Sequence, residues 1–207
     1  MANPDPQFAL YTAAQVRALD QAAIAGGVAG IELMERAARA ALDILRRRWP
    51  QAQTLCVVCG PGNNGGDGFL LAALACMAGM QAHVIATSEH STGDAALARE
   101  RCVREGAQVA LAAASLPNAD VYLDALFGSG LNRAPSGDAA KLIVALNAQS
   151  RPVLALDVPS GLDSESGVAF DPCVRAAATV CFVGWKRGMF TAQGADHCGE
   201  RSLATLD

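Results

Sequence analysis

Two hydrophobic patterns alternate along the chain: short runs that are apolar throughout, and longer stretches in which apolar residues recur every three or four positions. Runs that are apolar on both faces are typical of strands in a parallel sheet, and we predict strands at 53–59, 82–87, 107–112, 120–124, 153–157 and 178–183. Stretches with helical periodicity, at about 66–79, 93–105 and 137–149, connect them. The pattern predicts an α/β fold, a three-layer αβα sandwich around a Rossmann-like, doubly wound and mainly parallel sheet.

Two helices are predicted before the first of these strands. Thr12 to Gln15 forms a capping-box pattern, and the apolar spacing after it predicts a helix that ends near Gly26. A second helix is predicted from about Gly30 to the three arginines at 46–48, where positive charge suits a helix C-terminus. We therefore expect one domain over 1–207, with a helical extension at about 10–50 and an α/β core at about 51–207.

Composition narrows the class of protein. The 207 residues are 52% hydrophobic and 17% charged, enough for one large buried core. A net charge of −4 and the absence of a Lys/Arg-rich run argue against a nucleic-acid partner. No stretch approaches the roughly 20 apolar residues of a membrane span, and residues 1–6 lack the pattern of a signal peptide, so we expect no membrane association and a cytoplasmic location. The seven cysteines lie mostly in apolar segments and are interpreted as reduced, buried thiols.

The glycine-rich segment 60–68 follows the first core strand and precedes a helix. A strand, a glycine-dense turn and a helix start form a corner that can bind an anion or a nucleotide through backbone N–H groups. Gly60, Gly62 and Gly65 satisfy G-x-G-x-x-G, but that pattern alone is weak evidence for a dinucleotide site, and the segment carries no lysine, so it is not a P-loop. Asn63, Asn64 and Asp67 add oxygen ligands for a hard cation and hydrogen-bonding groups. The alternative is a turn that uses Asn and Gly only for their backbone conformations.

Two later strands deliver carboxylates to the same edge of the predicted sheet. Asp124 leads into the glycine-rich stretch 125–137, and Asp157 leads into 158–163, which contains Ser160. Because carboxyl-terminal loops of neighbouring parallel strands converge, Asn64, Asp124, Asp157 and Ser160 could share one pocket. Strand-end aspartates also serve as helix caps and turn formers, which is the structural alternative.

Three ordered motifs carry a family resemblance: Asn63-Asn64-Gly65-Gly66-Asp67-Gly68, Asp124–Leu131 and Asp157–Asp163. Together they closely resemble the YjeF N-terminal domain, the NAD(P)HX epimerases. The resemblance extends from 12–39 to Gly199 and so covers nearly the whole chain. It implies an isomerase of nicotinamide cofactor repair that interconverts the R and S forms of hydrated NADH or NADPH.

The resemblance also implies ligands and partners. It implies a potassium ion bound by Asn64, Asp124 and Ser160. It implies substrate contacts from Asn63, Asn64, Gly65, Gly66, Asp67, Gly128, Ser129, Gly130, Leu131, Asn132, Arg133, Ala134 and Asp157. A dehydratase that uses ADP or ATP and acts on the S form is implied as a fused or separate partner. A nucleotide- or protein-binding module without turnover is the alternative function.

The chemistry of such a reaction makes further demands on the residues. Inversion at C6 of the hydrated nicotinamide can proceed by loss and return of water through an iminium-like cation, which needs an acid/base group and stabilisation of positive charge. Asp157 is the preferred acid/base because it ends a strand beside Ser160, and Asp67 is the second choice. Glycine-loop N–H groups, helped by Arg133, would meet the pyrophosphate. The role of Lys186 stays open between a phosphate contact and a strand-exit turn. We expect a homodimer formed through the Ala- and Leu-rich helices of 12–48.

Overall fold

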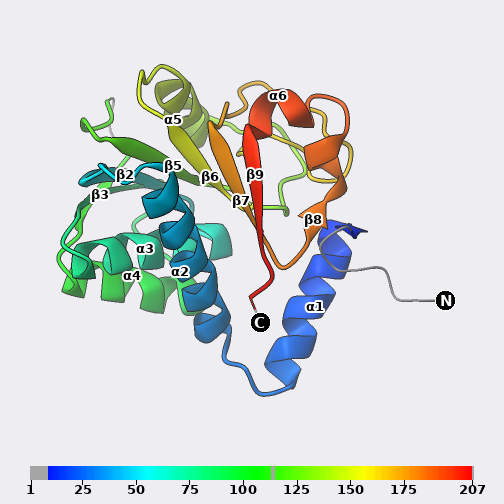
Figure 1. Ribbon diagram of the computed structural model, residues 1–207, viewed down its shortest axis with the longest axis horizontal. Helices are drawn as coiled ribbons and strands as arrows, with labels where there is room; N and C mark the ends of the chain where they lie inside the picture. The colour runs from blue at the N-terminus through cyan, green and yellow to red at the C-terminus, as the bar shows by residue number, and fades with distance from the viewer. Residues whose placement is uncertain (1–8, 113–114, 207) are drawn as a thin grey trace.

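The computed structural model describes residues 9–112 and 115–206 (Figure 1). Along the chain the elements are β1 (Leu10–Tyr11), α1 (Ala13–Ala25), α2 (Gly30–Arg48), β2 (Thr54–Cys59), α3 (Asn63–Met77), β3 (Gln81–Ala86), α4 (Asp94–Arg104), β4 (Gln108–Leu111), β5 (Val121–Ala125), α5 (Gly137–Asn147), β6 (Val153–Leu156), β7 (Ala178–Phe182), β8 (Trp185–Lys186), the 3-10 helix η2 (Arg187–Phe190), α6 (Gly194–Cys198) and β9 (Glu200–Ala204). The six predicted core strands are all present, each shifted by no more than one or two residues at its ends.

The main sheet has the strand order β4-β3-β2-β5-β6-β7-β9, and every neighbouring pair is parallel. The chain builds outward from β2 to β4, then crosses to β5 and builds outward in the other direction. The order therefore reverses between the adjacent strands β2 and β5, where Leu55 pairs with Val121. This topology confirms the predicted doubly wound sheet, and it places the switch point, where such folds bind ligands, beyond the ends of β2 and β5.

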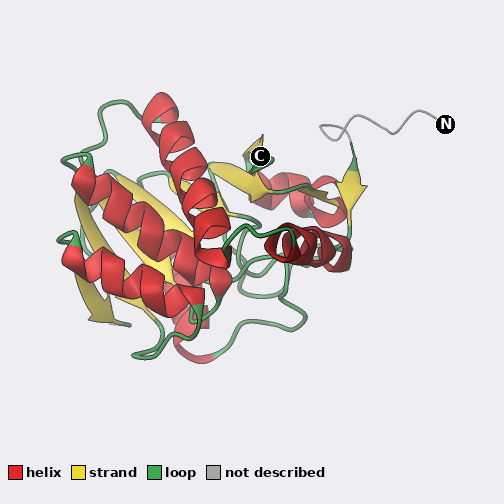
Figure 2. Cartoon of the chain, turned by 90° about the horizontal axis from the view of Figure 1, so that it is seen from below, coloured by secondary structure: helices red, strands yellow, loops and turns green. Residues whose placement is uncertain are grey.

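Apolar side chains pack against both faces of the sheet. The helices α2, α3 and α4 cover one face, with α3 between the other two, and α5 covers the other face. Figure 2 shows helices packed across the strands. Within β2, Val57 and Cys59 belong to the first core and Cys56 and Val58 to the second. The Cys56 and Cys59 thiols thus point to opposite faces and are both free and buried, as expected for core cysteines.

The two N-terminal helices follow the sequence prediction closely. Thr12 caps α1 with both hydrogen bonds of a capping box, and Trp49 ends α2 after the three arginines. The two helices differ in position: α2 packs on the sheet, whereas α1 lies apart from it, beside β8 (Figure 1). None of the helices in the described part of the chain is long and apolar enough to cross a membrane.

One predicted boundary is wrong, and it concerns the glycine-rich segment. Helix α3 begins at Asn63 rather than near 66, so the Asn-Asn-Gly-Gly-Asp sequence lies in its first turn and not in a loop. The glycines serve close packing: a Cβ on Gly65 would lie 1.9 Å from the Gly60 carbonyl oxygen, and one on Gly68 would lie 2.5 Å from the Ala125 Cβ. A helix start made of residues with low helix propensity is hard to read from sequence, because its packing requirements are not local.

Several short elements were not predicted, most of them after residue 183. Strand β9 extends the sheet beyond β7, and its short sequence is half-buried and mostly polar, as suits an edge. The two-residue strands β1 and β8 pair in parallel, with Leu10 opposite Trp185 and Tyr11 opposite Lys186. Such short elements carry no periodicity, so only the fold reveals them.

Candidate active site at the carboxyl edge of the sheet

The first turn of α3 lies at the switch point and presents free backbone donors. The first hydrogen bond of the helix runs from the Gly66 N–H to the Gly62 carbonyl, at 3.0 Å. The N–H groups of Asn63, Asn64 and Gly65 precede it and have no backbone partner within the described chain. Together with the helix dipole they provide a site for a phosphate group.

Asn64 carries a buried side chain with unused hydrogen-bonding capacity. Neither its Oδ1 nor its Nδ2 has a partner among the described residues, although both atoms are buried. The loop after β5 passes beside it, because a Cβ on Gly128 would lie 3.5 Å from the Asn64 Cγ. Buried polar atoms without partners are rare and mark places where a ligand or ion completes the structure.

Asp124 is fully buried at the end of β5 and joins this loop to the loop after β6. Its Oδ1 accepts hydrogen bonds from the Ser160 hydroxyl at 2.6 Å and the Leu126 N–H at 3.2 Å, and its Oδ2 accepts the Ser160 N–H at 2.7 Å. The Ser160 hydroxyl oxygen also accepts the Phe127 N–H at 2.9 Å. Burial raises the pKa of Asp124 to about 6, although these hydrogen bonds favour its charged form.

Asp157 directly follows β6 and is held in an unusual backbone conformation. Its φ of 65° is one that side-chain-bearing residues seldom adopt and that is found preferentially at functional sites. The Asp157 Oδ2 accepts the Ser129 N–H at 2.8 Å, and its Oδ1 forms an ion pair with the Lys186 ammonium. A Cβ on Gly128 would lie 2.8 Å from the Asp157 Oδ2. The Gly128 backbone is therefore enclosed between the Asp157 carboxylate and the Asn64 side chain.

Lys186 is the main site residue whose role the sequence did not determine. It is completely buried in β8, where its ammonium group donates to Asp157, to the Phe182 carbonyl at 2.7 Å and to the Cys181 Sγ at 3.4 Å. Burial opposes the charged form, but Asp157 and Cys181 keep the pKa of Lys186 above its ordinary value. It is thus neither an exposed turn residue nor a free phosphate ligand. A lysine within an apolar C-terminal segment was the only available signal.

Two further carboxyl groups approach this ion pair. Asp67 lies one turn after Asn64 in α3, and Asp20 lies on α1. Burial, followed by the charges of Asp157 and Asp20, raises the pKa of Asp67 well above its ordinary value. Burial also raises the pKa of Asp20, with Lys186 opposing and Asp157 adding to the shift. Asp20 was not anticipated, because the sequence gives no reason to connect the first helix with the strand ends.

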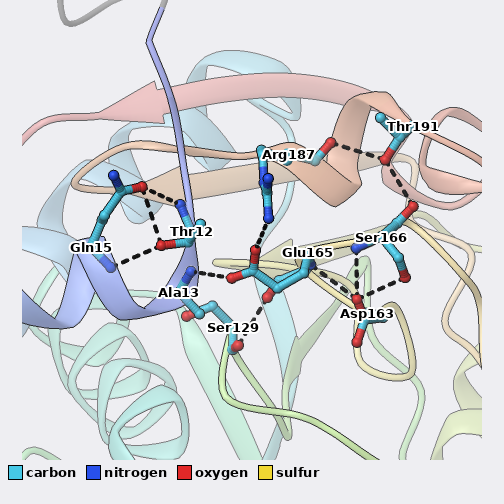
Figure 3. A network of polar contacts seen from close by, with 10 residues as sticks. Thr12, Ala13, Gln15, Ser129, Asp163, Glu165, Ser166, Arg187 and Thr191 are labelled. Atoms are coloured by element: carbon cyan, nitrogen blue, oxygen red, sulfur yellow. Dashed lines mark hydrogen bonds and ion pairs between the residues drawn. The ribbon is translucent and has the colours of Figure 1, made fainter.

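The loop at 128–134 is divided between the interior and the surface. Gly128 and Ser129 are partly buried against Asp157, and the Ser129 carbonyl accepts the Ser164 hydroxyl at 2.9 Å (Figure 3). The later residues form the outer part of the loop: Leu131 is partly buried, and Gly130, Asn132, Arg133 and Ala134 are exposed. The structure therefore places Arg133 at the rim, and it forms no ion pair with any residue of 9–112 or 115–206.

Gly66 faces away from this edge. A Cβ added there would lie 2.6 Å from the Met34 Sδ on α2, and its N–H is already used within α3. Of the α3 residues predicted to contact substrate, Gly66 thus has the least to offer a ligand directly. Its role in this structure is to let α2 and α3 approach each other.

The donors around Asn64 suit a hard monovalent cation. Four oxygen donors lie at this edge of the sheet: the unpaired Asn64 amide oxygen at the start of α3, the Asp124 carboxylate in β5, the Ser160 hydroxyl, and the Phe127 carbonyl, 3.3 Å from that hydroxyl. Oxygen ligands of mixed amide, carboxylate, hydroxyl and carbonyl type are those that hard cations prefer. The residues present therefore fit the potassium ion that the sequence resemblance implies.

A separate cleft lies at the opposite end of the strands. It has a volume of about 440 Å³ and is lined by residues at the end of α2 and before β2 and β3, among them Arg46, Arg47 and Met80. It contains none of the candidate site residues. Its arginines continue the last turn of α2, where cations offset the helix dipole.

Comparison with known proteins gives close relatives. The chain is 41% identical over 196 residues to a bifunctional NAD(P)H-hydrate repair enzyme of Coxiella burnetii, covering 92% of this chain but only 40% of that protein. It is 39% identical over 196 residues to an NAD(P)H-hydrate epimerase of Limosilactobacillus fermentum, covering 93% of this chain and 94% of that protein. The chain thus spans less than half the length of the bifunctional relative and nearly all of the shorter one.

A solved structure and a family profile agree with these relatives. The fold superposes on the crystal structure of the yeast protein ynu0 with a TM-score of 0.75 and 20% identity, covering 95% of this chain and 87% of that one. The profile of the YjeF-related protein N-terminus matches residues 30–188, from the start of α2 to the segment just after Lys186. By this match, which takes in all three sequence motifs, the chain belongs to the YjeF-related N-terminal family.

Proposed function

We propose that the protein is an NAD(P)H-hydrate epimerase, which interconverts the R and S forms of hydrated NADH or NADPH. The observation that carries the proposal is the convergence of Asn64, Asp124, Asp157 and Ser160 on the Phe127–Gly128 backbone at the switch point. The Limosilactobacillus epimerase, similar over almost its full length, supports the same activity.

The reaction needs only proton transfers and a stabilised cation. The C6 hydroxyl of the substrate takes up a proton and leaves as water, while the ring nitrogen lone pair forms an N1=C6 double bond. Water then adds to C6 from the other face and releases a proton, which restores the hydrate with inverted configuration. No electron is gained or lost overall, so the chain must supply an acid, a base and negative charge near the cation.

Two carboxyl groups of the site suit the roles of base and acid. Asp157 accepts the Ser129 N–H, is ion-paired with Lys186, and is the base that accepts the proton of the attacking water. Asp67 has a raised pKa and is the neutral acid for the departing hydroxyl. In the reverse direction the two exchange roles, as microscopic reversibility requires.

The substrate is anchored at its diphosphate. The free N–H groups of Asn63, Asn64 and Gly65 at the start of α3 supply the main contacts, and Arg133 at the rim adds positive charge. The nicotinamide end then reaches the carboxylates one helical turn further on. This placement supports recognition of a dinucleotide without a lysine in the glycine-rich segment.

Potassium is proposed to bind Asn64, Asp124 and Ser160. When bound, it supplies a fixed positive charge that joins the loops after β5 and β6 and helps hold a phosphate. The test uses a readout other than activity: thermal melting in potassium chloride and in choline chloride. Potassium should raise the melting temperature of the wild type but not of Asn64→Leu, which lacks the amide oxygen. Equal shifts in both proteins would contradict the assignment.

The activity itself is tested by following R-NADHX by chromatography as the S form appears. Wild type should accelerate the conversion far above the spontaneous rate, and Asp157→Asn should lose about a hundredfold or more, because acid/base groups contribute about 100- to 10,000-fold. Asp138→Asn is the matched control: it makes the same change at an exposed residue of α5 paired only with Lys141. Equal rates for the two variants would remove Asp157 from the chemistry.

A homodimer formed through the N-terminal helices is part of the proposal. Two large apolar side chains of α1 are well exposed, Leu19 at 44% and Ile24 at 48%, and so is Leu10 of β1 just before it, at 48%. Contact between two copies would bury them together. Light scattering at micromolar concentration should give twice the mass of the chain, and Leu19→Lys combined with Ile24→Lys should give the monomer. A monomeric wild type would contradict this part.

We also propose cooperation with an NAD(P)H-hydrate dehydratase that consumes the S form. The support is that the repair enzymes of Coxiella burnetii and Escherichia coli are named bifunctional and extend well beyond the matched region. The seven free cysteines support a reducing, cytoplasmic setting. The alternative is a binding module without turnover, which the epimerisation assay would identify by binding of the hydrate without conversion.

A further inference from the structure

A short turn after β6, residues 163–166, carries a buried serine, Ser164. The Asp163 Oδ1 holds the turn together: it accepts the Glu165 N–H at 3.1 Å, the Ser166 N–H at 2.7 Å and the Ser166 hydroxyl at 2.8 Å (Figure 3). An aspartate side chain that accepts backbone N–H groups shortly after its own position stabilises a tight turn. The backbone on both sides of Ser164 is therefore fixed locally.

The turn is also fixed to two distant segments. The Ser164 carbonyl accepts the N–H of Gly188, in the 3-10 helix η2, at 2.8 Å. The Glu165 carboxylate accepts the N–H of Ala13, the first residue of α1, at 2.6 Å and pairs with Arg187 of η2 at 2.6 Å (Figure 3). Ser164 therefore occupies a position that is set by its own turn, by η2 and by the start of α1.

The Ser164 side chain extends from this position to the loop after β5. Only 2% of Ser164 is exposed, and its hydroxyl donates to the Ser129 carbonyl at 2.9 Å. The N–H of the same Ser129 donates to the Asp157 Oδ2 at 2.8 Å. Both backbone polar groups of Ser129 are therefore held by the segment that follows β6, the carbonyl by Ser164 and the N–H by Asp157.

This contact lies at the boundary between the buried and the exposed parts of the loop. Before it, the Phe127 N–H donates to the Ser160 hydroxyl at 2.9 Å. After it, Gly130 and residues 132–134 are exposed. Without the Ser164 hydroxyl, the backbone of Ser129 would keep the contact of its N–H with the carboxylate but lose the contact that fixes its carbonyl. The N–H and the carboxylate could then move together.

The Ser129 N–H is the contact that best defines the direction of the Asp157 carboxylate. The Asp157 Oδ1 pairs with the Lys186 ammonium, a compact charge with three rotatable donors that accepts many angles. A backbone N–H is a single donor that prefers a nearly linear hydrogen bond, so its position sets the position of Oδ2. Accurate placement matters in catalysis, because a displacement of about 1 Å can cost about 100-fold in rate.

We propose that Ser164 is a positioning residue of the epimerase site: its hydroxyl fixes the Ser129 backbone, so that the Ser129 N–H holds the Asp157 carboxylate in the orientation in which it meets the substrate. The proposal rests on the proposed function and extends it to a residue that acts through Ser129 and Asp157. Within one short segment, Ser160 then belongs to the proposed cation site and Ser164 to the orientation of the base.

The first test compares kcat and KM for R-NADHX in wild type, Ser164→Ala and Ser166→Ala. In Ser164→Ala, kcat should fall about tenfold, because the base loses its fixed direction. Ser166→Ala is the matched control: it removes an exposed hydroxyl from the same turn and leaves Asp163 its two backbone donors, so kcat should stay at the wild-type value. A rise in KM with unchanged kcat in Ser164→Ala would overturn the proposal.

A double-mutant cycle distinguishes positioning of the base from a general structural role. Ser164→Ala should cost about tenfold in kcat when Asp157 is present but nothing further in Asp157→Asn, because that variant has no base to orient. The assay uses enough enzyme to raise the rate of Asp157→Asn above the spontaneous rate. A full loss repeated in Asp157→Asn would overturn the proposal, since a structural defect would act independently of the base.

A third measurement does not depend on turnover. Hydrogen exchange of the Ser129 amide, followed by NMR, should be about tenfold faster in Ser164→Ala than in wild type or Ser166→Ala, the effect of losing one hydrogen bond. An unchanged exchange rate would overturn the proposal. A wild type that shows this effect but does not convert R-NADHX would contradict the proposed function and leave the contacts of Ser164, Ser129 and Asp157 in place. The two failures are therefore distinguishable.

Discussion

The buried pair of Lys186 and Asp157 should be strongly coupled in folding. Lys186 is completely buried and Asp157 nearly so, and the lysine keeps only the Phe182 carbonyl and the Cys181 sulfur when Asp157 is neutralised. Lys186→Met likewise leaves the Asp157 carboxylate with the Ser129 N–H alone. Each single substitution therefore leaves one charged side chain without its ionic partner in a region from which water is largely excluded.

The magnitude follows from the burial of both groups. Breaking a buried ion pair on one side costs about 3–5 kcal/mol, because the remaining charge is uncompensated. Replacing both partners by neutral groups of similar size is often close to neutral. Asp157→Asn combined with Lys186→Met should therefore be more stable than either single variant. That reversal is the signature of the pair, since independent sites would add their costs.

The assay is urea unfolding followed by tryptophan fluorescence. With m values of about 1–3 kcal/mol per M, each single variant should lower the midpoint by 1 M or more, and the double variant should recover much of it. The pair Glu165–Arg187 is the matched control: its side chains are 36% and 50% exposed, so its coupling should not exceed about 1 kcal/mol. Additive losses in the Asp157 and Lys186 variants would refute the reasoning. The recovered double variant should still lack epimerase activity.

Two further predictions concern the loop after β5 and the start of that strand. Gly128→Ala should lower kcat/KM about 10- to 100-fold, because the added Cβ would lie 2.8 Å from the Asp157 Oδ2 and displace the carboxylate. Gly130→Ala is the control, because a Cβ there meets nothing within 4 Å, and it should lose much less activity. Equal losses in the two variants would contradict the role of the contact. Asp120→Asn should lower the free energy of unfolding by about 1 kcal/mol at pH 7, measured by urea unfolding, because it weakens the hydrogen bonds that the Asp120 carboxylate accepts. Of these, the bond from the Gln53 backbone N–H contributes most to the lowered pKa of Asp120. A depressed carboxyl pKa stabilises the fold above its ordinary value of about 3.9, so this difference should shrink as the pH falls below that value, and a difference that persists at pH 2 would contradict the assignment.

The sequence was most informative where the signal is local and repeated. The six core strands and the doubly wound sheet follow from apolar runs separated by helical periodicity, and the capping box of Thr12 marks the start of α1 to the residue. The strand-end positions of Asp124 and Asp157 predict that their carboxylates meet at one edge, because parallel strands end together. The structure brings both residues to that edge.

The remaining features depend on contacts between distant segments. Lys186 becomes a site residue only because the turn after β7 folds its side chain back toward Asp157, which no spacing in the sequence indicates. Asp20 precedes Asp157 by 137 positions, so the sequence gives no reason to expect the Asp157 charge to raise its pKa. The early start of α3 was missed because its glycines satisfy packing against Gly60 and Ala125 rather than a turn. Tertiary packing overrides local preference at all three places.

The most direct measurement of the central claim is conversion of R-NADHX in water enriched in ¹⁸O, with mass spectrometry of the S form. The account predicts conversion well above the spontaneous rate, with the heavy isotope in the C6 hydroxyl of the product, since the C6–O bond breaks and water returns. The isotope should enter at the enzymatic rate and much more slowly with Asp157→Asn. Conversion without isotope would contradict the loss and return of water, and no acceleration by the wild type would contradict the epimerase function itself.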